Sequence, residues 1–232
     1  MILAPLVVTG LLAMAAFPPD VYFEQTTLTR TDGQASGPGV SSRVWVSGRR
    51  LRLEGDAPKG PAFLLQLDLG QAYRLDPERQ VAVQIDLARL RNRSQMDSSA
   101  ASDLMGSAAE GEVRTAPLAT PRIIAGYRCR GYRLSAESLT LDVYMATEIP
   151  VGIDAFEGLV EWSGASQAMA GFLAEMRKLR GFPLESRARV SVRGQTLETV
   201  STITKVLVGP HPRALFEPPA GWRVEREAPP QP

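Results

Sequence analysis

Residues 44–54 read VWVSGRRLRLE and predict a β-hairpin. Valine and leucine alternate with polar residues on both sides of Ser47-Gly48, a pair suited to a tight turn. A period of two places the apolar side chains on one face of each strand and the polar ones on the other. The stretch therefore indicates a sheet with one buried face and one wet face, as is typical of antiparallel sheets.

The same alternation recurs along most of the chain, with turn-forming residues between the segments. Further strands are predicted at residues 21–30, 63–67, 71–75, 80–85, 122–134, 139–147, 186–192 and 196–208. The short spacing of the strands within residues 21–85 favours one antiparallel meander there, and the chain is predicted to be a mainly β domain.

Residues 165–180 form the clearest amphipathic helix that the sequence predicts. Ser163 or Ser166 would cap its start, and Gly181 follows its end. Its apolar stripe, at helical spacing, consists of Met169, Phe172, Leu173 and Met176. Because a sheet with one apolar face must bury that face, we expect this helix to cover it.

The apolar stripe of this helix has two interpretations. Methionine lines adaptable apolar sites well, so Met169, Phe172, Leu173 and Met176 are candidate ligand-binding residues. Alternatively, they are ordinary core. A large apolar cavity beneath the helix would favour the first interpretation, and normal packing density would favour the second.

Residues 1–17 are apolar and uncharged, and the run is too short to span a bilayer. Ala13-Met14-Ala15 fits a small-x-small cleavage pattern, so residues 1–16 are predicted to be a signal peptide and the mature protein to be periplasmic. The predicted cleavage site has no cysteine, so a lipid anchor is not expected there. A buried first strand and a short membrane anchor are the alternatives.

The remainder is predicted to be one domain, residues 17–227, followed by a disordered tail at 228–232. A Ser/Ala-rich insertion near 91–118 interrupts the strand rhythm. We expect a short helix and then a mobile surface segment there, either a solvated insertion or a functional flap.

The composition excludes several classes of function. The 232 residues carry a net charge of +1, with one cysteine and one histidine. This balance gives no electrostatic case for nucleic acid, and the counts exclude a disulfide and a multi-cysteine metal site. The arginines are spread along the chain and do not predict a phosphate site. No nucleophile elbow or phosphate loop occurs, so neither a cofactor nor an enzyme activity is predicted.

Only weak catalytic candidates remain. A Cys129–His211 dyad would require the fold to bring the two side chains together, and Cys129 is better interpreted as a small buried hydrophobe. Asp154 and Glu157, with Glu161 nearby, form an acidic group beside a predicted turn, where solvated carboxylates are common.

Residues 123–132 read IIAGYRCRGY and resemble a family signature. They are similar to the Ile-x-Gly-Tyr-x-Cys-x-x-Tyr motif of an uncharacterised family of exported bacterial proteins, a domain of unknown function. The matching motif residues are Gly126, Tyr127, Cys129 and Tyr132. Weaker matches lie at residues 46–53, 181–184 and 216–222.

The resemblance implies a LolA-like fold: a curved, incompletely closed antiparallel sheet, or open half-barrel, with one or more helices over its concave face. In LolA and LolB that cavity holds lipoprotein acyl chains. The resemblance supplies no catalytic residue.

The motif also has a structural interpretation from its residues alone. If the stretch is a strand, Ala125, Tyr127 and Cys129 share one face. Arg128 and Arg130 then share the other.

Two functions of different class follow. The first is a periplasmic carrier or chaperone that binds a lipid, an acyl chain or a lipidated partner in a half-barrel cavity. The second is a structural or protein-interaction domain of the envelope with a filled core. The sequence indicates neither the ligand nor the oligomeric state.

Overall fold

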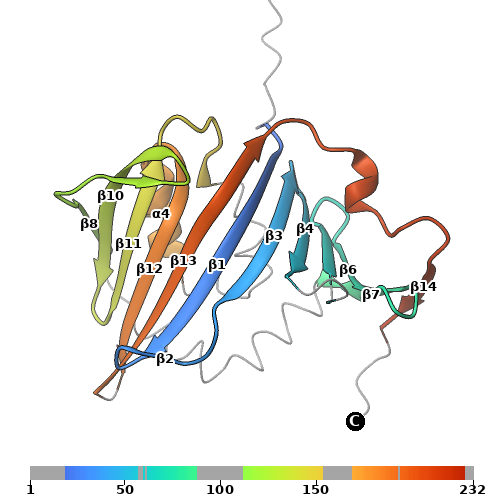
Figure 1. Cartoon of the computed structure of the whole chain (residues 1–232), viewed down its shortest axis with the longest axis horizontal. Coiled ribbons are helices and arrows are strands. Elements are labelled where there is room, and N and C mark those ends of the chain that lie inside the picture. The colour runs from blue at the N-terminus through green and yellow to red at the C-terminus, as the bar shows by residue number, and fades with distance from the viewer. Residues whose placement is uncertain are drawn as a thin grey trace, which may run out of the picture.

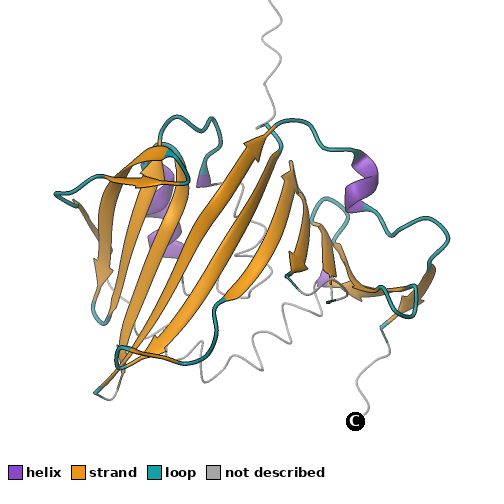
Figure 2. Ribbon diagram, in the orientation of Figure 1, coloured by secondary structure: helices purple, strands orange, loops and turns teal. Residues whose placement is uncertain are grey.

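The computed structural model describes residues 19–56, 60, 62–87, 112–153, 169–192 and 194–227. Their strands form one 14-stranded sheet, open and curved (Figure 1). One α-helix and one short 3-10 helix accompany it (Figure 2). The predicted fold class, mainly β with a single curved sheet and a helix on one face, is confirmed.

The strands, with their bounds, are β1 (Val21–Thr31), β2 (Gln34–Ala35), β3 (Val40–Ser47), β4 (Arg50–Gly55), β5 (Ala62–Gln66), β6 (Gln71–Asp76), β7 (Val81–Asp86), β8 (Arg114–Pro117), β9 (Arg122–Ile124), β10 (Tyr127–Ala136), β11 (Leu139–Ala146), β12 (Phe182–Val192), β13 (Gln195–Val208) and β14 (Arg223–Arg226). The helices are α4 (Ala170–Lys178) and the 3-10 helix η2 (Arg213–Phe216).

The sheet contains two antiparallel meanders, and the one predicted from the strands at residues 21–85 is the first of them. β3–β7 form the first and β10–β13 the second, and β1 lies between them, paired with β3 on one side and with β13 on the other. β14 pairs in parallel with β7 at the far edge. These long-range pairings are not encoded in the local alternation that predicts each strand.

The family-like stretch is a hairpin rather than one strand. Ala125 and Gly126 form the two-residue turn between β9 and β10, with φ of 48° and 84°. Positive φ at both positions is the signature of the turns that match the twist of a hairpin. Ala125 is therefore a turn residue, which corrects its predicted place on the face of Tyr127 and Cys129.

The turn between β3 and β4 also differs from the prediction. It consists of Gly48 and Arg49, one residue later than predicted.

Part of the predicted insertion is regular structure. Residues 114–117 form β8, which pairs with β10 at the edge of the second meander. Pro117 ends this strand, where a residue without an N–H is tolerated at a sheet edge. Residues 88–111, the leader and the tail lie outside the described residues.

Helix α4 is shorter than predicted. It begins at Ala170 after Met169, without a side-chain cap, and both predicted capping serines lie outside the described residues. Two basic residues occupy its last turn, where they complement the helix dipole. Gly181, at φ 106°, then turns the chain into β12, and a Cβ there would collide with the carbonyl oxygen of Ala146.

Both faces of β5–β7 are apolar, whereas the alternation predicts one wet face. Leu64 and Leu65 are neighbours on β5 and both are fully buried, on opposite faces. Trp222 packs against the cluster that contains Leu64. In addition, Gln66 donates a 2.8 Å hydrogen bond to the carbonyl oxygen of Phe216 in η2. The C-terminal segment thus covers the face that would otherwise be wet.

Candidate functional site: an apolar inner face and an arginine-lined cavity

One face of the sheet carries a continuous apolar row, which we call the inner face. Its residues lie in register across six strands, β1 and β3–β7, and none is more than 8% exposed. They are Val21, Val46, Leu51, Leu65, Ala72 and Ile85. All belong to one buried cluster, which also includes Phe23 and Val44.

Helix α4 lies on the same face as this row. Val143 of β11, which packs with the helix, is in register with Ser186 of β12. Ser186 pairs with Ser201, and Ser201 pairs with Thr27 of β1. Thr27 and Phe23 lie four residues apart on one face of β1, so the helix and the inner face are on the same side of the sheet.

The four residues of the predicted helix stripe differ in burial: two are buried and two are partly buried. Phe172 is fully buried and Met176 is 7% exposed, both in a second apolar cluster with β10–β12. Met169 packs against that cluster from a partly buried position, and Leu173 is half-buried. The structure thus packs Phe172, Met176 and Met169 against β10–β12, whereas the inner-face row lies on β1 and β3–β7. Their role toward a ligand stays a prediction.

The catalytic candidates are not brought together. Cys129 is fully buried within the first cluster, and burial raises the pKa of its thiol. The backbone N–H of His211 donates to a carboxylate oxygen of Asp20 at 2.8 Å, and its ring lies 6.5 Å from that of Phe216. No hydrogen bond joins Cys129 to His211. The structural interpretation of Cys129 therefore fits its surroundings.

The other candidate chemistry is limited in the same way. The predicted acidic group, Asp154, Glu157 and Glu161, lies outside the described residues. Within the described part of the chain, no group of three His, Cys, Asp or Glu side chains is placed to hold a metal ion.

An open cavity of about 550 Å³ lies beside β10, and we call it the arginine cavity. Its walls include Leu118, Arg128, Arg130, Tyr132 and Glu148. Both arginines are exposed. They alternate with buried Cys129 along β10, so they share the opposite side of the strand, as predicted.

Gly131 brings the wall of the arginine cavity close to β10. The backbone N–H of Leu118 donates to the Gly131 carbonyl oxygen at 2.9 Å. A Cβ at position 131 would lie 2.8 Å from a ring carbon of Tyr144 and 3.0 Å from Leu118. Only glycine allows this approach without displacing its neighbours.

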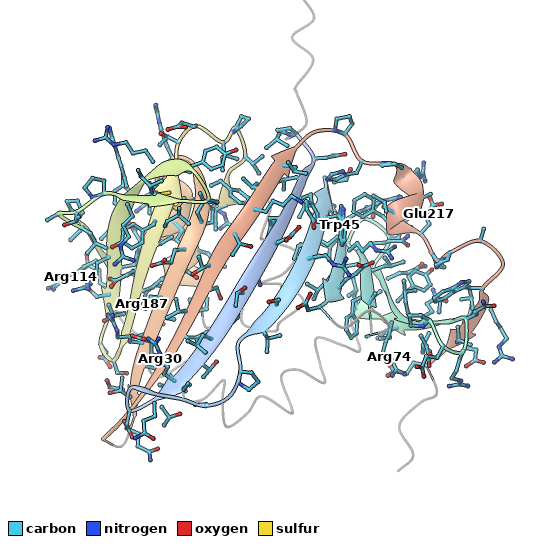
Figure 3. The ribbon with its side chains drawn as sticks, in the orientation of Figure 1. Arg30, Trp45, Arg74, Arg114, Arg187 and Glu217 are labelled. Atoms are coloured by element: carbon cyan, nitrogen blue, oxygen red, sulfur yellow. The ribbon has the colours of Figure 1, made fainter. Side chains whose placement is uncertain are left out.

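On the outer face, opposite α4, arginines are paired with acids. A row of alternating charge crosses five strands: Arg133–Asp142 at 2.6 Å, Asp142–Arg189 at 3.4 Å, Arg189–Glu198 at 2.7 Å and Glu198–Arg30 at 3.1 Å. Figure 3 shows Arg30 on this face. The hydrogen bond from Arg133 is the main cause that lowers the pKa of Asp142, and the bond from Arg189 does the same for Glu198.

The arginine cavity differs from this row in charge pairing. Among the described residues, Arg128, Arg130 and Glu148 form no ion pair within 4.0 Å. Sequence reasoning missed this site because the arginines look scattered along the chain. The available signal was the pair Arg128 and Arg130, at alternate positions of a predicted strand. That stretch was interpreted as structural only.

The fold and the site define an open, mainly β protein whose sheet carries a continuous apolar row on its inner face, with a basic cavity at its second meander. The chain belongs to the DUF4412 family, a domain of unknown function whose model matches residues 71–222. This confirms the predicted membership of a family of unknown function, while the motif that suggested it stays a prediction. No curated protein sequence matches the chain.

Solved structures of similar shape are distant. MucB shares 9% identity at a TM-score of 0.46, over 90% of this chain and 60% of its own. PNGF-II shares 13% at a TM-score of 0.36, over 90% of this chain and 31% of its own. A domain from Vibrio parahaemolyticus named for outer membrane lipoprotein sorting shares 8% at a TM-score of 0.31, over 85% and 89%. The chain thus spans about a third of PNGF-II, and likenesses this weak carry no functional argument.

Within the described ranges, no helix is both long and apolar enough to cross a membrane.

Proposed function

We propose that this chain is a non-enzymatic, exported protein of the bacterial envelope that binds an apolar ligand, a lipid or an acyl chain, on the inner face of its sheet. The observation that carries the proposal is the apolar row from Val21 to Ile85, in register across six strands. Such a row gives a continuous apolar lining, buried in this structure, whose shape suits a long, flexible hydrocarbon.

The dimensions of the row agree with this class of ligand. Six strands are separated by five spacings of about 4.8 Å, so the row is about 24 Å long. The hydrocarbon of one bilayer leaflet is about 15 Å thick, half of a core of about 30 Å. The row is therefore longer than one acyl chain laid across the strands.

The remaining chemistry agrees with a binding protein. The buried Cys129 thiol, with its raised pKa, is a poor nucleophile. The apolar leader with Ala13-Met14-Ala15 supports export to the periplasm. A lipidated envelope protein would present the same acyl chemistry as a free lipid.

One observation favours the alternative, a structural or interaction domain with a filled core. Phe172 and Met176 are buried in a cluster with β10–β12, as ordinary core residues are. The inner-face row is buried to the same extent, none of it more than 8% exposed, so a ligand reaches it only by displacing what covers it.

Titration of the delipidated protein with a fluorescent fatty-acid analogue separates the two functions. Leu65 and Leu64 provide matched variants, because both are fully buried leucines on β5 and only Leu65 belongs to the inner face. We expect saturable binding of the analogue. Leu65→Ala should lower the affinity about tenfold through lost apolar contact, whereas Leu64→Ala should change it less than about twofold. Phe172→Ala tests whether α4 also lines the site.

Absence of a saturable signal would contradict the carrier function and favour the filled core. An equal loss of affinity in Leu64→Ala and Leu65→Ala would also contradict it, since general destabilisation would then explain both. Circular dichroism of each variant at the titration temperature provides the folding control.

A further inference from the structure

We propose that the arginine cavity binds the phosphate head group of an anionic amphiphile whose chain lies in the apolar interior. This inference rests on the proposed function and adds the chemical class of the ligand. It concerns the cavity of about 550 Å³ beside β10, which the apolar-ligand proposal does not use.

The spacing of the two arginines suits one phosphate group. Arg128 and Arg130 lie on the same side of β10, two residues apart, so their Cα atoms are separated by about 7 Å. Arginine side chains are long enough to converge from that separation on a single group. A guanidinium donates two parallel hydrogen bonds, a geometry that phosphate oxygens match.

Among the described residues, no ion pair neutralises the two arginines of the cavity. Arginines of the outer face pair with Asp142 and Glu198 at 2.6–3.4 Å. Within the described part of the chain, Arg128 and Arg130 have no such acid, although Glu148 lines the same cavity. The described walls of the cavity hold two guanidinium groups and one carboxylate, a net charge of +1, which favours a single small anion over a polyanion.

The walls of the arginine cavity reach both apolar clusters. Leu118 packs against the first cluster, which contains the inner face, and Tyr132 packs against the second, beneath α4. A ligand with its head between the arginines therefore meets apolar side chains next to them. This juxtaposition fits an amphiphile better than a fully polar phosphate ester.

Glu148 supplies a test that a purely structural cavity would not satisfy. Glu148 lines the same cavity, where a carboxylate repels a phosphate, so Glu148→Gln should tighten binding of an anionic head group. The same change should leave a neutral head group unaffected.

The experiment compares lysophosphatidic acid with a monoacylglycerol of the same chain, by isothermal titration of the delipidated full chain. We expect lysophosphatidic acid to bind at least tenfold more tightly. Arg128→Gln with Arg130→Gln should abolish this preference and leave monoacylglycerol binding unchanged. The matched control, Arg74→Gln with Arg79→Gln, removes two exposed arginines outside the cavity and should preserve the preference. Raised salt should reduce the preference as well.

Other outcomes distinguish a failure of the head-group site from a failure of the proposed apolar-ligand function. Equal binding of both lipids would overturn the head-group site and leave the apolar-ligand function standing. Binding of neither lipid would overturn the proposed function and this inference with it. Free glycerol 3-phosphate that competes as strongly as lysophosphatidic acid would overturn the amphiphile, because the chain would then contribute nothing.

Discussion

Replacing Phe172 by alanine tests whether α4 is anchored on the sheet as core. The side chain is fully buried among leucine, valine and methionine side chains of β10–β12. Losing its transfer free energy costs about 2 kcal/mol. At about 24 cal/mol per Å³ of cavity, a residual void on the order of 80 Å³ adds about 2 kcal/mol. Alanine favours the helix, so no propensity cost enters. We expect a loss of about 4 kcal/mol in the free energy of unfolding.

Urea unfolding followed by tryptophan fluorescence measures this loss, and a thermal melt should show a decrease of about 8–16 °C for a domain of this size. Leu173→Ala is the control, because Leu173 is only half-buried on the same helix, and it should cost about 1 kcal/mol. A loss below about 1 kcal/mol for Phe172→Ala would refute the packing argument. It would indicate that the ring lines a space open to ligand or solvent.

Three further predictions concern the core, the outer face and the backbone. Cys129 should react slowly with a thiol reagent in the native state and quickly in denaturant, and Cys129→Ser should cost about 1–2 kcal/mol; fast native labelling at neutral pH would contradict its burial. The pKa of Asp142 is lowered by Arg133, so their pairing contributes its full stability above the unfolded-state pKa of about 3.9 and loses it as pH falls through the folded value. Urea unfolding measured from pH 5 down to pH 2.5, an interval of about 2.5 pH units around that pKa, should show that the free energy of unfolding falls less in Asp142→Asn than in the wild type. The same fall in both proteins would count against the pairing. Gly181→Ala should destabilise more than Gly194→Ala, since both have positive φ but only the former meets backbone atoms; equal losses in a thermal melt would exclude the steric cause.

The elements predicted best from sequence are those set by local pattern. Residues 44–54 form the expected hairpin because alternation and a glycine turn act within eleven residues. The β12–β13 hairpin follows for the same reason. Periodicity does not distinguish a bend at Gly126 from the two-residue turn that Ala125 and Gly126 form, so one strand is predicted over residues 122–134 where the structure has a hairpin.

Long-range pairing explains what the sequence did not predict. β1 joins the two meanders, and β14 adds a parallel edge strand to β7, through partners far away along the chain. The side of β10 that carries Arg128 and Arg130 could be predicted from alternation. The cavity beside them depends on the register of β8 with β10 and on the close approach at Gly131, which no local pattern contains.

The most direct test of the account is native mass spectrometry of the protein purified from its own periplasm, before and after lipid extraction. The account predicts a bound species whose mass matches a lipid, which extraction removes and which reappears in the organic phase as an anionic, phosphate-bearing lipid. The protein mass alone in both spectra, with no lipid in the extract, would contradict the claim that the inner face holds an apolar ligand.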